Sequence, residues 1–262
     1  MTHPYFVDAP YPRVLAHRGL TVDEAIAENS YASVAAAKRA GATYVESDCH
    51  LTRDGEVVLF HDADLRRVTG DPRRVVDVEL SELTDLMADR GGLITLRTAL
   101  EDFPTVRFNL DVKAPGAADA VGMLVAGHGE RVLLTSFADT RRRAAVASAA
   151  RHAPTGAVAP ATSAGRETIA RLLWGLVARS PRLVASSLAG IDALQVPERQ
   201  GPVRVVTPRL LEAAHRHGVE VHVWTVNDPA DMSRLVGMGV DGIVTDRVDV
   251  ALTTLGPALG HP

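Results

Sequence analysis

The chain has 262 residues, which is enough to bury a large hydrophobic core within one domain. Its 28 basic and 32 acidic residues give a net charge of −4, which disfavours a protein that binds nucleic acid through a basic surface. The single cysteine, Cys49, excludes an intramolecular disulfide framework and a zinc cluster of thiolates. No apolar run approaches the roughly 18 residues of a membrane span, and the first residues do not resemble a secretory signal. We therefore expect a single cytoplasmic domain, residues 1–262, without stable membrane insertion.

Short β-branched runs alternate with longer runs rich in alanine and leucine along the chain. This alternation, repeated about eight times, indicates a parallel sheet with helices outside it. The length favours closure of that sheet into an α/β (β/α)₈ TIM barrel over an open sheet. We expect strands at 14–19, 43–51, 57–61, 107–113, 132–137, 156–159, 193–196, 219–226 and 242–246, and helices at 31–40, 96–102, 117–126, 140–150, 166–178, 209–217 and 230–238.

One segment interrupts this pattern. Residues 62–89 are charged, lack long apolar runs and contain Gly70 and Pro72. We interpret the region of about 62–95 as a short insertion on the barrel rim after the second strand region, with a helix near 81–87.

Polar residues inside strands that are buried on both faces need partners or a function. Alternation places Glu46 and Asp48 on one face of their strand, and Asp111 comes from a neighbouring strand. Three carboxylates without a thiolate suit a hard divalent cation, Mg²⁺ or Ca²⁺. The alternative is a buried ion-pair network in which Asp111 or Glu46 pairs with Lys113 or Arg18.

Two histidines, His17 and His61, stand at predicted strand ends, where barrel enzymes build their active sites. A lone histidine is more often structural, but two beside a carboxylate cluster favour acid–base chemistry near neutral pH. Lys113 also ends its strand and Arg18 is next to His17, and these two cations could bind a phosphate along with the metal. Trp224 comes late in its strand, where it either walls an apolar part of a substrate or fills the core.

Several short motifs occur together in a characteristic order. They are LAHRG (15–19), ENS (28–30), ESD (46–48), TRDG (52–55), VVLFHD (57–62), DVK (111–113), SF (136–137), WTVN (224–227) and DGIVTD (241–246). They resemble the glycerophosphodiester phosphodiesterases over nearly the whole chain, and the motifs of the first third are the most specific.

The resemblance implies a (β/α)₈ barrel with a segment inserted after the His-Asp pair. It also implies that a divalent cation, Mg²⁺ or Ca²⁺, assists hydrolysis of a small glycerophosphodiester to sn-glycerol 3-phosphate and an alcohol. Carried over by position, the residues are His17 and His61 as the general acid–base pair, Glu46, Asp48 and Asp111 as metal ligands, Arg18 and Lys113 as phosphate-binding groups, Glu28 and Asn29 as a substrate-proximal pair, and Trp224 as a wall of the glycerol pocket.

Two kinds of departure from the family pattern are visible. Ala27 and Ser30 replace the usual proline and threonine around the Glu-Asn pair, which keeps the functional groups. Asp111 replaces the usual glutamate and is one methylene shorter, so it could pull the metal toward its strand or alter the metal preference.

Other functions fit the sequence less well. A lysophospholipase D-like or sphingomyelinase-D-like enzyme that acts on lipids would need an apolar, membrane-facing rim, whereas residues 62–89 are charged. A non-catalytic phosphate-binding barrel would not need both histidines and all three carboxylates.

Overall fold

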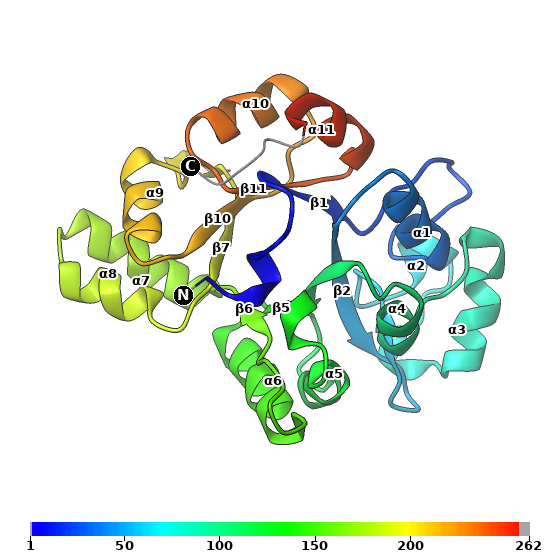
Figure 1. Ribbon diagram of the computed structural model, residues 1–262. Coiled ribbons are helices and arrows are strands. Elements are labelled where there is room, and N and C mark those ends of the chain that lie inside the picture. Colours follow the sequence, from blue (N-terminus) through cyan, green and yellow to red (C-terminus); the bar gives the residue numbers. More distant parts are fainter. Residues whose placement is uncertain (1, 257–262) are drawn as a thin grey trace.

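The computed structural model describes residues 2–256. Eight parallel strands stand around a common centre, with helices on the outside, as expected for a (β/α)₈ TIM barrel (Figure 1). The strands are hydrogen-bonded in the order β6-β5-β4-β2-β1-β11-β10-β7. Their bounds are β1 (Arg13–His17), β2 (Tyr44–Leu51), β4 (Arg107–Val112), β5 (Val132–Thr135), β6 (Ala161–Thr162), β7 (Ala193–Val196), β10 (Glu220–Val223) and β11 (Gly242–Thr245).

The two ends of this order, β6 and β7, meet to close the barrel. They share an isolated parallel bridge between Ser163 and Ala193. Two backbone hydrogen bonds flank it, from Ala164 N to Ala193 O at 3.2 Å and from Asp192 N to Thr162 O at 2.9 Å. This seam, defined by residues 162–164 and 192–193, contains fewer backbone pairs than the register between β2 and β4.

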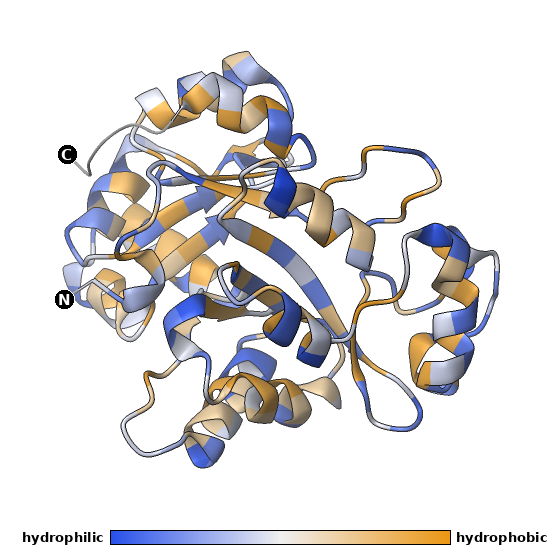
Figure 2. Cartoon of the chain, turned by 45° about the vertical axis from the view of Figure 1, so that its right-hand side comes forward, coloured by the Kyte–Doolittle hydropathy of each residue, from blue (hydrophilic) through white to orange (hydrophobic). Residues whose placement is uncertain are grey.

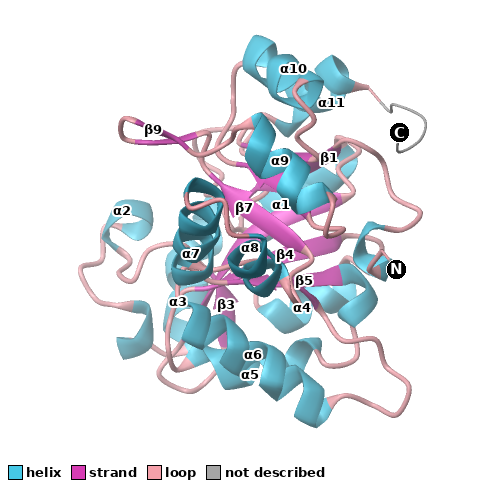
Figure 3. Ribbon diagram, turned by 90° about the vertical axis from the view of Figure 1, so that its left-hand side faces the viewer, coloured by secondary structure: helices cyan, strands magenta, loops and turns pink. Residues whose placement is uncertain are grey.

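Helices surround the sheet (Figure 3), and they carry both hydrophilic and hydrophobic residues (Figure 2). Their starts carry recognisable signals: the Ser30 hydroxyl accepts the Ser33 N–H, and three later helices begin with proline after a serine, threonine or aspartate cap. The sequence patterns did not anticipate α8 and α11. The helices are α1 (Tyr31–Arg39), α4 (Leu96–Asp102), α5 (Ala117–Val125), α6 (Asp139–His152), α7 (Arg166–Val177), α8 (Pro181–Leu188), α9 (Pro208–His215), α10 (Pro229–Gly237) and α11 (Val248–Leu255).

The strand expected at 156–159 is wrong. This stretch is a turn, in which Gly156 has a φ of +81° and the Ala157 N–H bonds to Pro154 O at 3.0 Å. Pro160 has no N–H to give to a ladder, so pairing begins only at Ala161 in β6. The apolar residues at 157–159 are exposed to solvent and do not pack in the core.

The expected alternation along β2 is confirmed. Val45 and Cys49 face the main core between the sheet and the helices, whereas Tyr44 faces the inside of the barrel and packs near Tyr5. Tyr5 belongs to the short helix η1 (Pro4–Phe6), which covers the barrel floor (Figure 1). The guanidinium of Arg107 donates to main-chain carbonyls of this segment and fixes it under the barrel. The floor is therefore closed, and the opposite rim is left for chemistry.

Between β3 (Val57–Leu59), which pairs antiparallel with β2, and α4 lies a small unit on the rim. Its helices are α2 (Arg66–Thr69), η2 (Val75–Asp77), α3 (Leu80–Met87) and η3 (Ala88–Arg90), so the helix expected near 81–87 is confirmed. We call this segment, residues 62–95, the rim insertion. It packs on Val58 and Phe60 in a buried cluster separate from the main core, to which the insertion contributes Leu65, Val75, Val78, Leu83 and Met87.

Two short strands, β8 (Arg199–Gln200) and β9 (Val203–Arg204), form a hairpin after β7. Within residues 2–256, no helix has the length and apolar character needed to cross a membrane.

Candidate active site

The carboxyl ends of the strands surround a cavity of about 610 Å³. The register explains why its polar residues meet, because His17 of β1 lies opposite Glu46 of β2, and Asp48 of β2 lies opposite Asp111 of β4. Eight of the ten site residues expected from the sequence line this cavity: His17, Arg18, Glu46, Asp48, His61, Asp111, Lys113 and Trp224. The other two, Glu28 and Asn29, are not among its lining residues.

His61 reaches the same cavity from the antiparallel strand β3. The Phe60 N–H donates to Asp48 O at 2.8 Å, and His50 Nε2 lies 3.1 Å from His61 O. These contacts bring the chain after β3 across the end of β2. His61 and Lys113 also line a more open hollow on the rim insertion.

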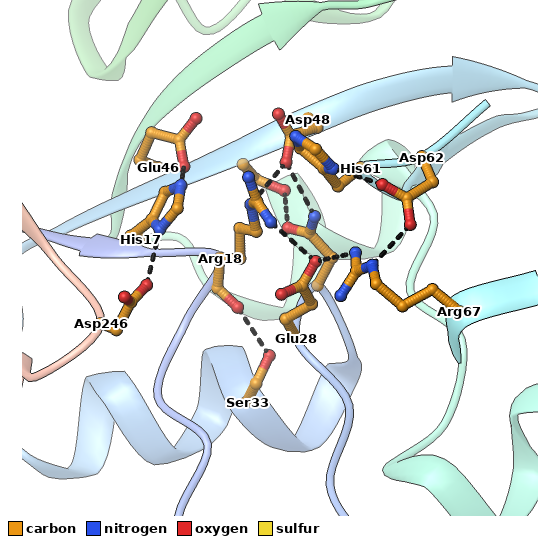
Figure 4. A network of polar contacts seen from close by, with 12 residues as sticks. His17, Arg18, Glu28, Ser33, Glu46, Asp48, His61, Asp62, Arg67 and Asp246 are labelled. Atoms are coloured by element: carbon orange, nitrogen blue, oxygen red, sulfur yellow. Dashed lines mark hydrogen bonds and ion pairs between the residues drawn. The ribbon is translucent and has the colours of Figure 1, made fainter. Parts of the chain in front are cut away.

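Each catalytic-candidate histidine has a carboxylate at its Nδ1. His17 Nδ1 lies 2.6 Å from Asp246 Oδ1, and His61 Nδ1 lies 2.6 Å from Asp62 Oδ1 (Figure 4). The bond with His17 lowers the pKa of Asp246; burial alone would raise the pKa of Asp62, but its bonds with Arg67 and His61 lower it. Ionised carboxylates only accept, so each Nδ1 carries the proton and each Nε2 is left for the substrate.

These partner carboxylates were missed by the sequence reasoning. Asp62 stands in the VVLFHD motif and Asp246 closes the DGIVTD motif, but neither was given a role. Asp246 is itself held by Asn227, whose Nδ2 donates to Asp246 Oδ2 at 2.7 Å. Their position directly after the end of a strand was the signal in the sequence that could have identified them.

The buried carboxylates and cations form an ion-pair network, as the alternative reading of the sequence anticipated. Lys113 Nζ lies 2.6 Å from Asp111 Oδ2 and 3.0 Å from Asp48 Oδ1. Arg18 pairs with Asp48, with Nε at 3.2 Å from Oδ2 but without the alignment of a hydrogen bond. Burial alone would lower the pKa of Lys113, but Asp48 and Asp111 raise it, so Lys113 stays charged.

Glu46 has no such partner. Burial, followed by repulsion from Asp48 and Asp111, raises the pKa of Glu46 well above its ordinary value. Its Oε2 is buried without a hydrogen bond and lies 3.8 Å from His17 Nε2. Asp111 Oδ1 is likewise buried and without a hydrogen bond, and burial raises the pKa of Asp111 despite Lys113. A cation bound beside Glu46 and Asp111 would offset the free-energy cost of burying their negative charges.

The donor chemistry fits a hard divalent cation, but a ready ligand cluster is not formed. Glu46 and Asp111 each offer an oxygen without a hydrogen bond, whereas both oxygens of Asp48 contact Lys113, Asn29 or Arg18. Among the residues that the structure describes, no three acidic, histidine or cysteine side chains are grouped so that they could hold a metal.

Glu28 and Asn29 lie behind the cavity and hold residues that line it. Asn29 Nδ2 donates to Asp48 Oδ2 at 3.0 Å, and Glu28 Oε1 accepts from Arg18 Nη1 at 2.8 Å. Arg18 and Asn29 both have positive φ angles, of 60° and 55°. Such angles are costly for residues other than glycine, and here they belong to two side chains that converge on Asp48.

The side of the cavity away from the rim insertion is mostly apolar. Phe137 and Trp224 meet edge to face, with ring centroids 5.9 Å apart. The wall continues over α7, the end of β7 and the segments next to them through Ala164, Ile169, Ala170, Leu173, Val196, Pro197 and Val205. Arg166, Gln195 and Gln200 also line the cavity, and the Arg166 guanidinium lies 4.6 Å from the Phe137 ring centroid. The cavity thus has a charged end and a mostly apolar end.

Comparison with known proteins agrees with this geometry. The model of the glycerophosphoryl diester phosphodiesterase family matches residues 17–250. The probable glycerophosphodiester phosphodiesterase 2 of Mycobacterium tuberculosis is 35% identical over 242 residues, which cover 90% of this chain and 88% of that protein. The crystal structure of the Thermotoga maritima glycerophosphodiester phosphodiesterase is similar with a TM-score of 0.68 at 26% identity, and covers 92% of this chain and 97% of that one.

A shorter match reaches a protein that is named for a lipid substrate. Lysophospholipase D of Rattus norvegicus is 34% identical over 115 residues, or 38% of this chain and 36% of that protein. The match to the family model, residues 17–250, spans all the residues that line the cavity. The chain therefore belongs to the glycerophosphoryl diester phosphodiesterase family of phosphodiester-hydrolysing enzymes.

Proposed function

We propose that the enzyme hydrolyses glycerophosphodiesters to sn-glycerol 3-phosphate and an alcohol, with His17 and His61 as the general acid–base pair and a divalent cation as cofactor. One observation carries this proposal: both imidazoles line one cavity, and each has its Nδ1 held by a carboxylate. Each Nε2 is thereby free to exchange a proton with the substrate. One histidine takes the proton of the attacking oxygen, and the other gives a proton to the oxygen of the leaving alcohol.

Glu46, Asp48 and Asp111 would hold the cation, Mg²⁺ or Ca²⁺. The buried oxygens of Glu46 and Asp111 that lack hydrogen bonds support this assignment. When bound, the cation would neutralise negative charge on the phosphate during the reaction. Because Asp111 is shorter than the usual glutamate, we expect it to affect the choice of cation.

Lys113 and Arg18 would bind the phosphate oxygens. Both are held in place by carboxylates that also line or border the cavity. Fixed cations of this kind stabilise charge that develops in a transition state without reorganising. Trp224 would wall the glycerol moiety, and the hollow shared by His61 and Lys113 would take the leaving alcohol.

The test is turnover of glycerophosphocholine and glycerophosphoethanolamine, measured as the release of sn-glycerol 3-phosphate. We expect His17→Ala and His61→Ala each to lower kcat by at least about 10²-fold. Exhaustive chelation should abolish activity, and added Mg²⁺ or Ca²⁺ should restore it. Near-normal turnover of either variant would refute the acid–base assignment, and full activity after chelation would refute the cation.

The apolar end of the cavity favours a second candidate, hydrolysis of lysophospholipids. The sequence argument against lipids considered only residues 62–89, but the apolar wall comes from α7 and the loop after β7. An acyl chain on the glycerol could lie along Ile169 and Leu173. The matched substrates are glycerophosphocholine and lysophosphatidylcholine. We expect Leu173→Gln to lower kcat/KM for the lipid alone; equal effects on both substrates would contradict this second candidate.

The single domain over residues 1–262 and the cytoplasmic location stay predictions. Both can be checked with the expressed protein, by its unfolding transition and by cell fractionation.

A further inference from the structure

One side chain of the rim insertion contacts both sides of the charged end of the cavity. Arg67 Nε donates to Asp62 Oδ2 at 2.6 Å, and Arg67 Nη2 donates to Glu28 Oε1 at 2.6 Å (Figure 4). Arg67 comes from α2, whereas Glu28 comes from the loop before α1. A single guanidinium therefore joins two segments that are 39 residues apart in the chain.

The two carboxylates that Arg67 holds have site residues on their other side. Asp62 Oδ1 contacts His61 Nδ1 at 2.6 Å, and Glu28 Oε1 accepts from Arg18 Nη1 at 2.8 Å. The contacts run without interruption in the order His61, Asp62, Arg67, Glu28, Arg18. Positive and negative groups alternate from Asp62 to Arg18, so each carboxylate has a cation on at least one side.

Stability alone does not account for this arrangement. The Arg67 side chain is 51% exposed, and exposed ion pairs contribute about 0–1 kcal/mol each. The geometry instead exploits the planar fork of arginine, which presents separate N–H groups to two acceptors at once. A lysine at this position would carry the same charge, but on a single nitrogen, and could not form the bonds to Asp62 and Glu28 in the same directions.

We propose that Arg67 is a positioning residue that fixes His61 through Asp62 and Arg18 through Glu28. This inference rests on the proposed function of His61 and Arg18. Arg67 thereby makes the folded rim insertion a requirement for an assembled site. Arg67 does not line the main cavity, and in the rim hollow, which it does line, its guanidinium is held by the two carboxylates, so it acts through them.

The rim insertion offers a matched control. Arg73 also bridges two carboxylates, with Nη2 at 2.8 Å from Asp71 and Nη1 at 2.6 Å from Glu82. Its side chain is similarly exposed, at 43%. Neither Asp71 nor Glu82 contacts a site residue, so Arg73→Lys removes the same kind of double ion pair without reaching the cavity.

The first experiment compares the wild type, Arg67→Lys and Arg73→Lys in the full chain, with glycerophosphocholine as the substrate. We expect Arg67→Lys to lower kcat/KM at least about tenfold, as for partners that orient a catalytic ligand, and Arg73→Lys to stay within about twofold. The thermal midpoints of both variants should stay within about 4 °C of the wild type. Equal kcat/KM for the two variants would overturn the proposal.

The two arms of Arg67 can be separated by double variants. In an Asp62→Asn background, the effect of Arg67→Lys on kcat should shrink, because the path to His61 is already broken. In a Glu28→Ala background, the effect on KM should shrink, because the oxygen that joins Arg67 to Arg18 is removed. Full additivity of kcat and KM in both backgrounds would mean that Arg67 acts only on general stability and would overturn the proposal.

A second readout does not depend on turnover. In protein with ¹⁵N-labelled histidine, the ring nitrogens of His61 and His17 should report a protonated Nδ1 in the wild type. Arg67→Ala should change the His61 signals and leave those of His17 unchanged. If the wild type lacks activity but His61 responds, the proposed function fails and the positioning role stands. If the wild type is active and His61 does not respond, the positioning role fails.

Discussion

The two histidines of the site are held by different parts of the molecule. His17 ends β1 and its partner Asp246 follows β11, which pairs with β1 in the sheet. His61 is held by Asp62 and Arg67, which belong to the rim insertion. One histidine is thus fixed by the barrel, and the other by the rim insertion, which shares a buried cluster with Val58 and Phe60. If the rim insertion unfolds before the barrel, only the half of the site that contains His17 should stay assembled.

Among the variants that test how the two histidines are held, we expect the largest loss of activity from changes to their partner carboxylates. We expect Asp246→Asn and Asp62→Asn each to lower kcat by about tenfold or more, because an amide can leave the imidazole in the wrong tautomer. Asp62→Asn should also loosen Arg67, so it should raise KM more than Asp246→Asn does. Steady-state kinetics checks both points, and unchanged kcat in either variant would contradict the role of that carboxylate.

The next prediction separates the two cores. Leu83 is fully buried in the rim insertion, and Leu110 is fully buried in the barrel core. Truncation of either leucine to alanine should cost about 2–5 kcal/mol of the unit that contains it. We expect Leu83→Ala to lose activity on heating before the far-UV circular dichroism of the barrel changes.

Leu110→Ala is the control, since both signals should fall together in that variant. Limited proteolysis adds a second measurement, because Leu83→Ala should be cleaved first within residues 62–95. Coincident loss of activity and circular dichroism in both variants would show that the rim insertion and the barrel unfold as one unit.

A smaller effect is expected behind His17. Asn227 donates to Asp246 Oδ2, and its own Oδ1 accepts from the Asp246 N–H at 3.0 Å. Asn227→Ala removes these bonds without touching the imidazole, so we expect a loss of about 1 kcal/mol in transition-state stabilisation, or roughly fivefold in kcat. His61 should be unaffected, which ¹⁵N spectra of the histidines can check. A loss as large as that of Asp246→Asn would mean that Asn227 contacts the substrate.

The smallest effect concerns acid stability. Burial alone would raise the pKa of Asp62, but its bonds with Arg67 and His61 keep it below the ordinary value of 3.8, and the bond with His17 does the same for the pKa of Asp246. Each carboxylate therefore contributes stability above that value, and this contribution is lost as the pH falls through the folded pKa. Urea unfolding of the wild type and of the two asparagine variants should differ most near neutral pH and converge toward pH 2.

Much of the site follows from the sequence because it depends on strand geometry. A period of two places Glu46 and Asp48 on one face, and parallel register brings Asp111 beside Asp48. His17 and His61 were predicted as site residues because they stand at the ends of strands. The partner of His17 does not follow from any local period, because Asp246 is 229 residues away from it. The partner of His61 directly follows it in the sequence, but strand alternation alone gives Asp62 no role.

The errors have physical causes as well. The strand expected at 156–159 rested on apolar letters, but Gly156 and Pro160 impose a turn and remove a donor. The alternative in which Asp111 or Glu46 pairs with Lys113 or Arg18 is confirmed for Asp111 and Lys113. It missed Asp48, which contacts Arg18, Lys113 and Asn29 together. Side-chain direction at a crowded strand end decides such pairings, and the sequence pattern carries no information about it.

The seam between β6 and β7 has a consequence for how the cavity changes shape. Ala164 and Val196, which line the apolar wall, lie at or next to this seam, whereas the carboxylates stand on the densely paired strands β2 and β4. We therefore expect thermal opening to start beside the apolar wall and to leave the charged end closed. In hydrogen exchange, the amides of Ala164 and Asp192 should exchange before those within β2. If they do, substrates of different bulk would be admitted by widening one side of the enzyme, while the polar groups at the other side keep their spacing.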